Sequence, residues 1–185
     1  MKTTDIPKFI CNPNYSTHIN WKYIEKTLSD YNEWITIERM GGLNLNPDFQ
    51  RGHVWSENKQ IAFVEYCLKG GLGSKDILFN HPNWQGSFEG EIVLVDGKQR
   101  LEAVRKFIRN ELPVFDGHCL NDFEDKDRLL RMNGANFIFK INNLKTRKEV
   151  LQWYLDLNTG GVVHTNEEIK KVQQLLEQEK EQEQE

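Results

Sequence analysis

The sequence predicts a single domain in which helices and strands are interleaved along the chain. Its 185 residues suffice for one sizeable core and are too few for two ordinary domains. Apolar residues recur at helical spacing in some segments, whereas short runs rich in β-branched and aromatic residues indicate strands in others. We expect an irregular arm (1–19), a folded body (20–172) and a charged, disordered helical tail (173–185).

A helix is expected at the start of the body. Trp21, Ile24, Leu28 and Tyr31 recur at the spacing of one helix face, and Asn20 precedes them as a candidate N-cap. The arm before it contains prolines and asparagines without any periodicity, which is typical of irregular structure.

A strand, a loop and a second helix should follow. Residues 34–40 are rich in β-branched and aromatic side chains and end at Gly41, which predicts a strand stopped by a turn. Turn-forming residues recur over 43–55, so we expect an ordered loop there. Ser56 is placed to cap a helix that ends at Gly70.

The second half of the body contains a strand, turn and helix in immediate succession. The apolar strand 92–95 gives way to a polar turn and then to an amphipathic segment that reaches Ile108. The other expected elements are strands at 77–79, 112–115 and 137–141, a helix at 147–157, and a last helix from Asn166 with Thr165 and Glu168 as its capping box.

Charge and composition limit the classes of function. The net charge is −4, but residues 177–185 alone contribute five glutamates against one lysine, so the rest of the chain is close to neutral. No apolar run is long enough to span a membrane, and the three cysteines (Cys11, Cys67 and Cys119) form no paired zinc or redox motif. We expect a soluble cytoplasmic protein with reduced cysteines and a local anion-binding face.

The candidate anion site is the turn Asp96-Gly97-Lys98-Gln99-Arg100. The first backbone N–H groups of a helix lack partners within the helix and carry the positive end of its dipole, so phosphate groups bind there readily. Gly97 lets the backbone approach a ligand closely, and Lys98 and Arg100 can neutralise phosphate charge. Asp96 would either orient Arg100 or a water, or hold a divalent cation.

A family resemblance rests on two segments taken together. The segment Asn46-Pro47-Asp48-Phe49-Gln50-Arg51, with Trp55 downstream, precedes the turn at Asp96. This order resembles the N-terminal domain of the GmrSD-type modification-dependent restriction endonucleases, with a pattern of roughly P-x-[FY]-Q-R, a tryptophan, and D-G-Q-Q-R after a strand. Including the turn at 157–161, the resemblance covers residues 30–172. More distantly, the chain is similar to the ParB and sulfiredoxin superfamily.

The resemblance implies an α+β fold, a small mixed sheet with surrounding helices, that binds a nucleoside triphosphate. ATP, GTP and CTP are left open, Mg²⁺ is a candidate cofactor through Asp96, and slow NTP hydrolysis is a candidate activity. The implied phosphate-binding residues are Gln50, Arg51, Gly97, Lys98, Gln99 and Arg100. Asp96 and Gln99 are the catalytic candidates, and His53, Asn158 and Thr159 are accessory candidates.

The chain departs from the family pattern at two residues, and it lacks a histidine in the setting of a nuclease centre. Lys98 replaces the first glutamine of D-G-Q-Q-R, which should strengthen phosphate binding, and Glu102 adds a negative charge nearby. None of the five histidines has the acidic setting of a nuclease centre.

These observations favour a nucleotide-binding domain that acts in DNA restriction, modification or phage counter-defence. One alternative is a non-enzymatic module that keeps the fold and binds DNA or a protein partner, which would supply the nuclease or be inhibited. The other is a metal-dependent nuclease of the ParB type that uses Asp96.

Overall fold

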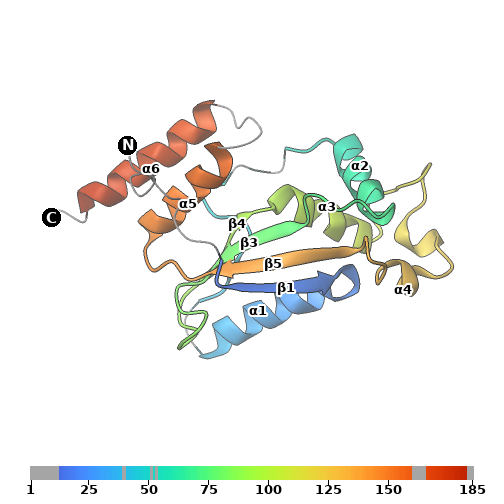
Figure 1. Cartoon of the computed structure of the whole chain (residues 1–185), viewed down its shortest axis with the longest axis horizontal. Helices are drawn as coiled ribbons and strands as arrows, with labels where there is room; N and C mark the ends of the chain where they lie inside the picture. Colours follow the sequence, from blue (N-terminus) through green and yellow to red (C-terminus); the bar gives the residue numbers. More distant parts are fainter. Residues whose placement is uncertain (1–12, 39–40, 51, 53, 160–165, 183–185) are drawn as a thin grey trace, which may run out of the picture.

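The protein is built around a five-stranded mixed sheet with helices on both faces (Figure 1). The computed structural model describes residues 13–38, 41–50, 52, 54–159 and 166–182. The strands are β1 (Tyr15–Asn20), β2 (Leu43–Asn44), β3 (Asp76–Asn80), β4 (Ile92–Asp96) and β5 (Asn136–Asn142), in the order β1-β5-β3-β4-β2. The outer pair β1–β5 and the inner pair β3–β4 are antiparallel, whereas β5–β3 and β4–β2 are parallel. This is the α+β class that the resemblance implies.

The helices divide between the two faces of the sheet. They are α1 (Ile24–Glu38), α2 (Glu57–Leu68), α3 (Lys98–Ile108), α4 (Lys126–Leu129), α5 (Arg147–Thr159) and α6 (Asn166–Gln182), with 3₁₀ turns at Trp21–Tyr23 and Leu120–Asp122. Because side chains alternate along a strand, Ile77 and Phe79 of β3 join the larger core with α1, α2 and α3, while Leu78 joins a second core with α5 and α6. The described helices include none that is long and apolar enough to cross a membrane.

Most elements lie where the sequence predicts them. Trp21, Ile24, Leu28 and Tyr31 are buried, although the side chain of Asn20 makes no capping hydrogen bond. The hydroxyl of Ser56 accepts a hydrogen bond from the Lys59 backbone N–H at 3.4 Å, as expected of the α2 N-cap. The predicted strands at 77–79, 92–95 and 137–141, and the helices from Lys98, Arg147 and Asn166, are all present.

Two predictions for the segments before residue 41 are wrong. The arm expected over 1–19 is not irregular throughout, because Tyr15–Asn20 pairs with β5 from Tyr15 opposite Ile141 to Asn20 opposite Asn136. This edge strand lacks apolar alternation, so backbone pairing rather than side-chain pattern defines it. The strand expected over 34–40 is also wrong, since α1 continues to Glu38. Extending a helix adds one hydrogen bond per residue, which outweighs the weak strand preference of β-branched residues.

Three later segments also differ from expectation. The strand predicted at 112–115 is reduced to a single bridge between Val114 and His118, because Phe115 and Asp116 adopt positive φ and turn the chain back. The loop expected over 43–55 contains the short strand β2. The tail expected to fray is helical to Gln182, and Arg147 Nε forms an ion pair with Glu179 Oε1 at 3.1 Å. Thr165 of the expected capping box lies outside the described residues.

A buried histidine follows β3 directly. His81 is fully buried beside the rings of Trp84 and Phe88, and its Nδ1 accepts a hydrogen bond from the Asn83 backbone N–H at 3.2 Å. Burial lowers the pKa of the imidazole below its ordinary value of 6.5, and the positive charge of Lys145 acts in the same direction. His81 is therefore neutral in the folded protein at pH 7.

The free energy of unfolding should fall as pH decreases from about 7.5 to 5.5, because the unfolded chain binds a proton that the folded imidazole excludes. The variant His81→Asn keeps an acceptor for the Asn83 N–H and cannot be protonated. We expect it to be less stable than wild type at the upper pH and to lose stability less steeply on acidification. Urea unfolding at a series of pH values measures both slopes, and equal slopes would contradict a neutral buried imidazole.

Candidate functional site

A cleft of about 650 Å³ opens where β4 passes into α3. Its walls come from four parts of the chain: the loop before α2, the first turn of α2, the β4–α3 turn and the end of α5. The lining residues are Gln50, Val54, Trp55, Ser56, Lys59, Val95, Asp96, Gly97, Lys98, Gln99, Arg100, Tyr154 and Asn158. The two segments that carry the family resemblance therefore meet at one cleft.

Gly97 shapes the floor of the cleft. It is the N-cap of α3, and its φ of 95° lies in the left-handed region. A Cβ at this position would lie 2.7 Å from Ile77 Cδ1 and 3.0 Å from the Asp76 carbonyl oxygen, so the turn packs directly against β3. No side chain caps α3, and its first-turn residues Lys98, Gln99 and Arg100 line the cleft.

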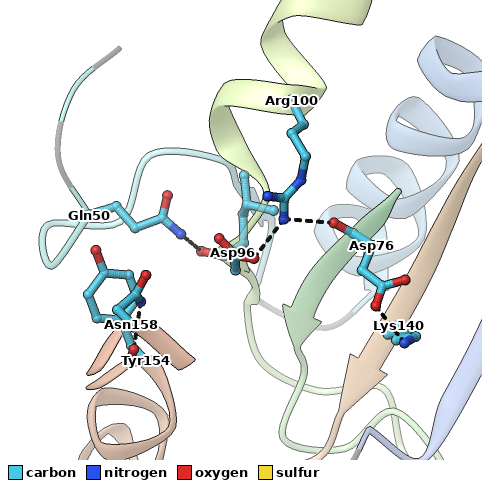
Figure 2. A network of polar contacts seen from close by, with 8 residues as sticks. Gln50, Asp76, Asp96, Arg100, Lys140, Tyr154 and Asn158 are labelled. Carbon is cyan, nitrogen blue, oxygen red and sulfur yellow. Dashed lines mark hydrogen bonds and ion pairs between the residues drawn. The ribbon is translucent and has the colours of Figure 1, made fainter. Parts of the chain in front are cut away.

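Arg100 is held from two sides by the sheet (Figure 2). Its Nη2 donates to Asp96 Oδ2 at 2.7 Å and to the Asp76 carbonyl oxygen at 3.0 Å. The carboxylate of Asp76 in turn pairs with Lys140 Nζ of β5 at 2.6 Å. Asp96 thus orients Arg100, which is one of the roles expected for it, and the guanidinium ties the start of α3 to the adjacent strand.

Gln99 holds the loop in front of α2. Its Oε1 accepts hydrogen bonds from the backbone N–H groups of Val54 at 3.0 Å and Trp55 at 3.1 Å, and its Nε2 donates to the Gly52 carbonyl oxygen at 3.1 Å. The amide therefore acts on the cleft through Gly52, Val54 and Trp55, which we call the strap. Gln99 is a positioning residue in this arrangement.

The loop that carries Gln50 is fixed to the sheet and to both C-terminal helices. Gln50 Nε2 donates to the Leu94 carbonyl oxygen at 2.6 Å. Arg147 of α5 binds the Asp48 carboxylate at 2.8 Å, and Lys171 of α6 donates to the Asp48 carbonyl oxygen at 2.7 Å. The hydrogen bond from Arg147 lowers the pKa of Asp48 below its ordinary value.

Lys98 faces the cleft from the first turn of α3. Partial burial lowers the pKa of its ammonium, while the nearby Glu102 carboxylate raises it. Lys98 also lines a smaller hollow of about 370 Å³ together with Asn46, Glu102, Arg105 and Lys106. Its position between the two hollows makes it a central cation of this region.

Of the remaining predicted residues, one lines the cleft and the others lie outside the described part of the chain, in whole or in their side chain. Asn158 lines the cleft, and its Nδ2 donates to the Tyr154 carbonyl oxygen at 2.6 Å. The predicted contacts of Arg51 and His53 lie outside the described residues, as do Gly160 and Gly161 of the glycine turn. Thr159 ends α5, and its side chain also lies outside the description.

Sequence reasoning missed several cleft residues. Lys59 and Tyr154 line it, as does Ser56, which was predicted only as a helix cap. Lys59 follows Ser56 by three residues, so the predicted cap already implied that it lies in the first turn of α2. Tyr154 precedes Asn158 by one helical turn, which places both on one face of α5. Within the described residues, no group of three histidine, cysteine, aspartate or glutamate side chains could hold a metal ion.

Comparison with known proteins matches most of the chain to a family. Residues 31–184 match the model of the family described as GmrSD restriction endonuclease, N-terminal domain. No curated protein and no solved structure matches the chain significantly.

Replacing Gly97 tests the close contact between the turn and β3. Gly97→Ala should lower the free energy of unfolding by about 2–4 kcal/mol, because positive φ and steric overlap both oppose the methyl group. Gly117→Ala is a matched control: its φ is 105°, but nothing lies within 4 Å of the added Cβ. We expect the control to lose about 1 kcal/mol in urea unfolding, and equal losses would contradict the contact with β3.

Removing the Gln99 amide tests the strap. In Gln99→Ala the backbone amides of Val54 and Trp55 should exchange with solvent roughly tenfold faster or more, because each loses its acceptor. Gln173→Ala, on the exposed surface of α6, controls for the loss of a glutamine. Hydrogen–deuterium exchange followed by NMR measures the exchange rates of both backbone amides. Unchanged rates in Gln99→Ala would refute the positioning role.

Proposed function

Because the chain belongs to the GmrSD restriction endonuclease N-terminal domain family, and so to proteins of DNA restriction, we propose that it binds a nucleoside triphosphate in the cleft beside Gly97. The family name describes the N-terminal part of a restriction enzyme. We assign nucleotide binding to this domain and DNA cleavage to a partner domain or subunit.

The observation that carries the proposal is the convergence of positive groups on one cleft. The N-termini of α2 and α3 both open on it, at Ser56 and Gly97, and the lysines Lys59 and Lys98 line it. Helix N-termini and lysine ammonium groups stabilise phosphate groups by charge and by hydrogen bonds. The volume of about 650 Å³ falls within the range of small-molecule sites.

The opposite part of the cleft offers neutral polar groups. The amides of Gln50 and Asn158 line it beside Tyr154, and each amide donates one hydrogen bond to a backbone carbonyl oxygen (Figure 2). Amide groups can pair with ribose hydroxyls and with the edges of a base. We therefore place the phosphates near the two helix N-termini and the nucleoside near α5.

Mg²⁺ fits this arrangement as a partner of the nucleotide. Asp96 is the single carboxylate among the described residues that line the cleft. Proteins commonly bind Mg²⁺ through one or two carboxylates together with the phosphates of the substrate. Bound there, Mg²⁺ would neutralise phosphate charge, and Asp96 would hold it in addition to orienting Arg100.

The arrangement favours binding over rapid hydrolysis. Gln99 is engaged with the strap through both ends of its amide, and Asp96 is paired with Arg100 through Oδ2 and, in this proposal, also holds Mg²⁺. A group that activates water must reach that water with a free acceptor. Any turnover by this chain should accordingly be slow.

Isothermal titration calorimetry with ATP, GTP, CTP and UTP, with and without Mg²⁺, tests the proposal. Wild type should bind at least one of them, and Lys98→Met should weaken that binding roughly 10- to 100-fold, because a charge-assisted contact to phosphate is lost. Lys26→Met, an exposed lysine paired with Asp30 on α1, should bind as wild type does. Failure of wild type to bind all four nucleotides would overturn the proposed function.

A further inference from the structure

Lys59 occupies a position at the cleft that neither the sequence motif nor the family match singles out. It lies in the first turn of α2, and its Nζ lies 4.9 Å from the centroid of the Trp55 ring. Among the described residues it forms no ion pair, so the ring is the only described group that holds the ammonium in place. Its charge is therefore not neutralised by a described carboxylate.

The platform under Lys59 is fixed by three contacts. The Trp55 backbone N–H donates to Gln99 Oε1, and its carbonyl oxygen accepts from Gln60 Nε2 at 3.0 Å. The Trp55 ring packs edge to face on Phe63, with ring centroids 5.4 Å apart. The side chain of Lys59 thus lies on an aromatic ring that is anchored to both α2 and α3.

The charged side chains of the cleft include a second lysine besides Lys98. Four charged side chains line it among the described residues: Lys59, Asp96, Lys98 and Arg100. The Asp96 carboxylate already pairs with Arg100 at 2.7 Å, and the Arg100 side chain is only 20% exposed. The other positive groups of the lining are the ammonium groups of Lys59 and Lys98.

We propose that Lys59 binds the polyphosphate of the nucleotide opposite Lys98, with Trp55 as the platform that orients its ammonium. This inference rests on the proposed function and gives one of its positive groups, Lys59, a specific partner and a platform. A triphosphate carries more negative charge than a monophosphate, so a second cation should matter most for the triphosphate.

Titration calorimetry of the full chain with each nucleoside triphosphate and its monophosphate tests the inference. Lys59→Gln should weaken triphosphate binding roughly tenfold and reduce the preference for triphosphate over monophosphate. Lys59→Arg keeps the charge and should stay within about twofold of wild type. Circular dichroism should show the same helix content in all variants.

Lys69→Gln is the matched control. Lys69 caps the other end of the same helix, and its Nζ lies 5.2 Å from the centroid of the Phe115 ring, away from the cleft. Its triphosphate affinity should equal that of wild type. Wild-type affinity in Lys59→Gln, or an equal loss in Lys69→Gln, would overturn the role of Lys59 and leave the proposed function standing. Absence of binding by wild type would overturn both.

Discussion

The close packing of Gly97 on β3 is the constraint on which the cleft depends. A residue with a Cβ would overlap Ile77 and the Asp76 carbonyl oxygen, so a side chain here would push α3 away from the sheet. The same contact brings Arg100 within reach of two acceptors on neighbouring strands, Asp96 and Asp76. The position of α3, and with it Lys98 and Gln99, follows from this one approach of backbone to backbone.

The opposite wall of the cleft is fixed by a different set of forces. Phe49 is buried against Tyr154, with ring centroids 5.3 Å apart, and Asp48 is bound by both Arg147 and Lys171. Arg147 also pairs with Glu179, so one guanidinium joins α5, α6 and the loop that carries Gln50. These charges are partly exposed, and each pair alone contributes little to stability. These ion pairs act by orientation, because they fix the loop that carries Gln50 against α5 and α6, and the three segments together form this wall of the cleft.

Local patterns predicted most of this fold. Ser56 as a cap and the strand–turn–helix at Gly97 depend on short-range chemistry. The expectation that Gln50 faces that turn came from the family resemblance instead. The edge strand β1 and the extension of α1 beyond residue 34 depend instead on long-range pairing and on helix propagation. The hydrogen-bond partners of the site residues could not be predicted from local sequence either, because Gln99 and its partner Gly52 lie 47 positions apart. The sequence named several residues of the cleft, but the contacts that hold them in place are long-range pairings that it does not reveal.

The contacts give four positions of the motif Asp96–Arg100 an architectural role. Asp96, Gly97, Gln99 and Arg100 each make a contact that builds the turn, the strap or the link to β3. Lys98 lines the cleft, and it is the position that departs from the D-G-Q-Q-R pattern expected from the resemblance. A change at an architectural position would disturb the fold, whereas a change at position 98 alters the charge of the cleft. In place of a neutral glutamine, Lys98 adds positive charge to the cleft, and the Glu102 carboxylate one helical turn later raises the pKa of its ammonium against the effect of burial.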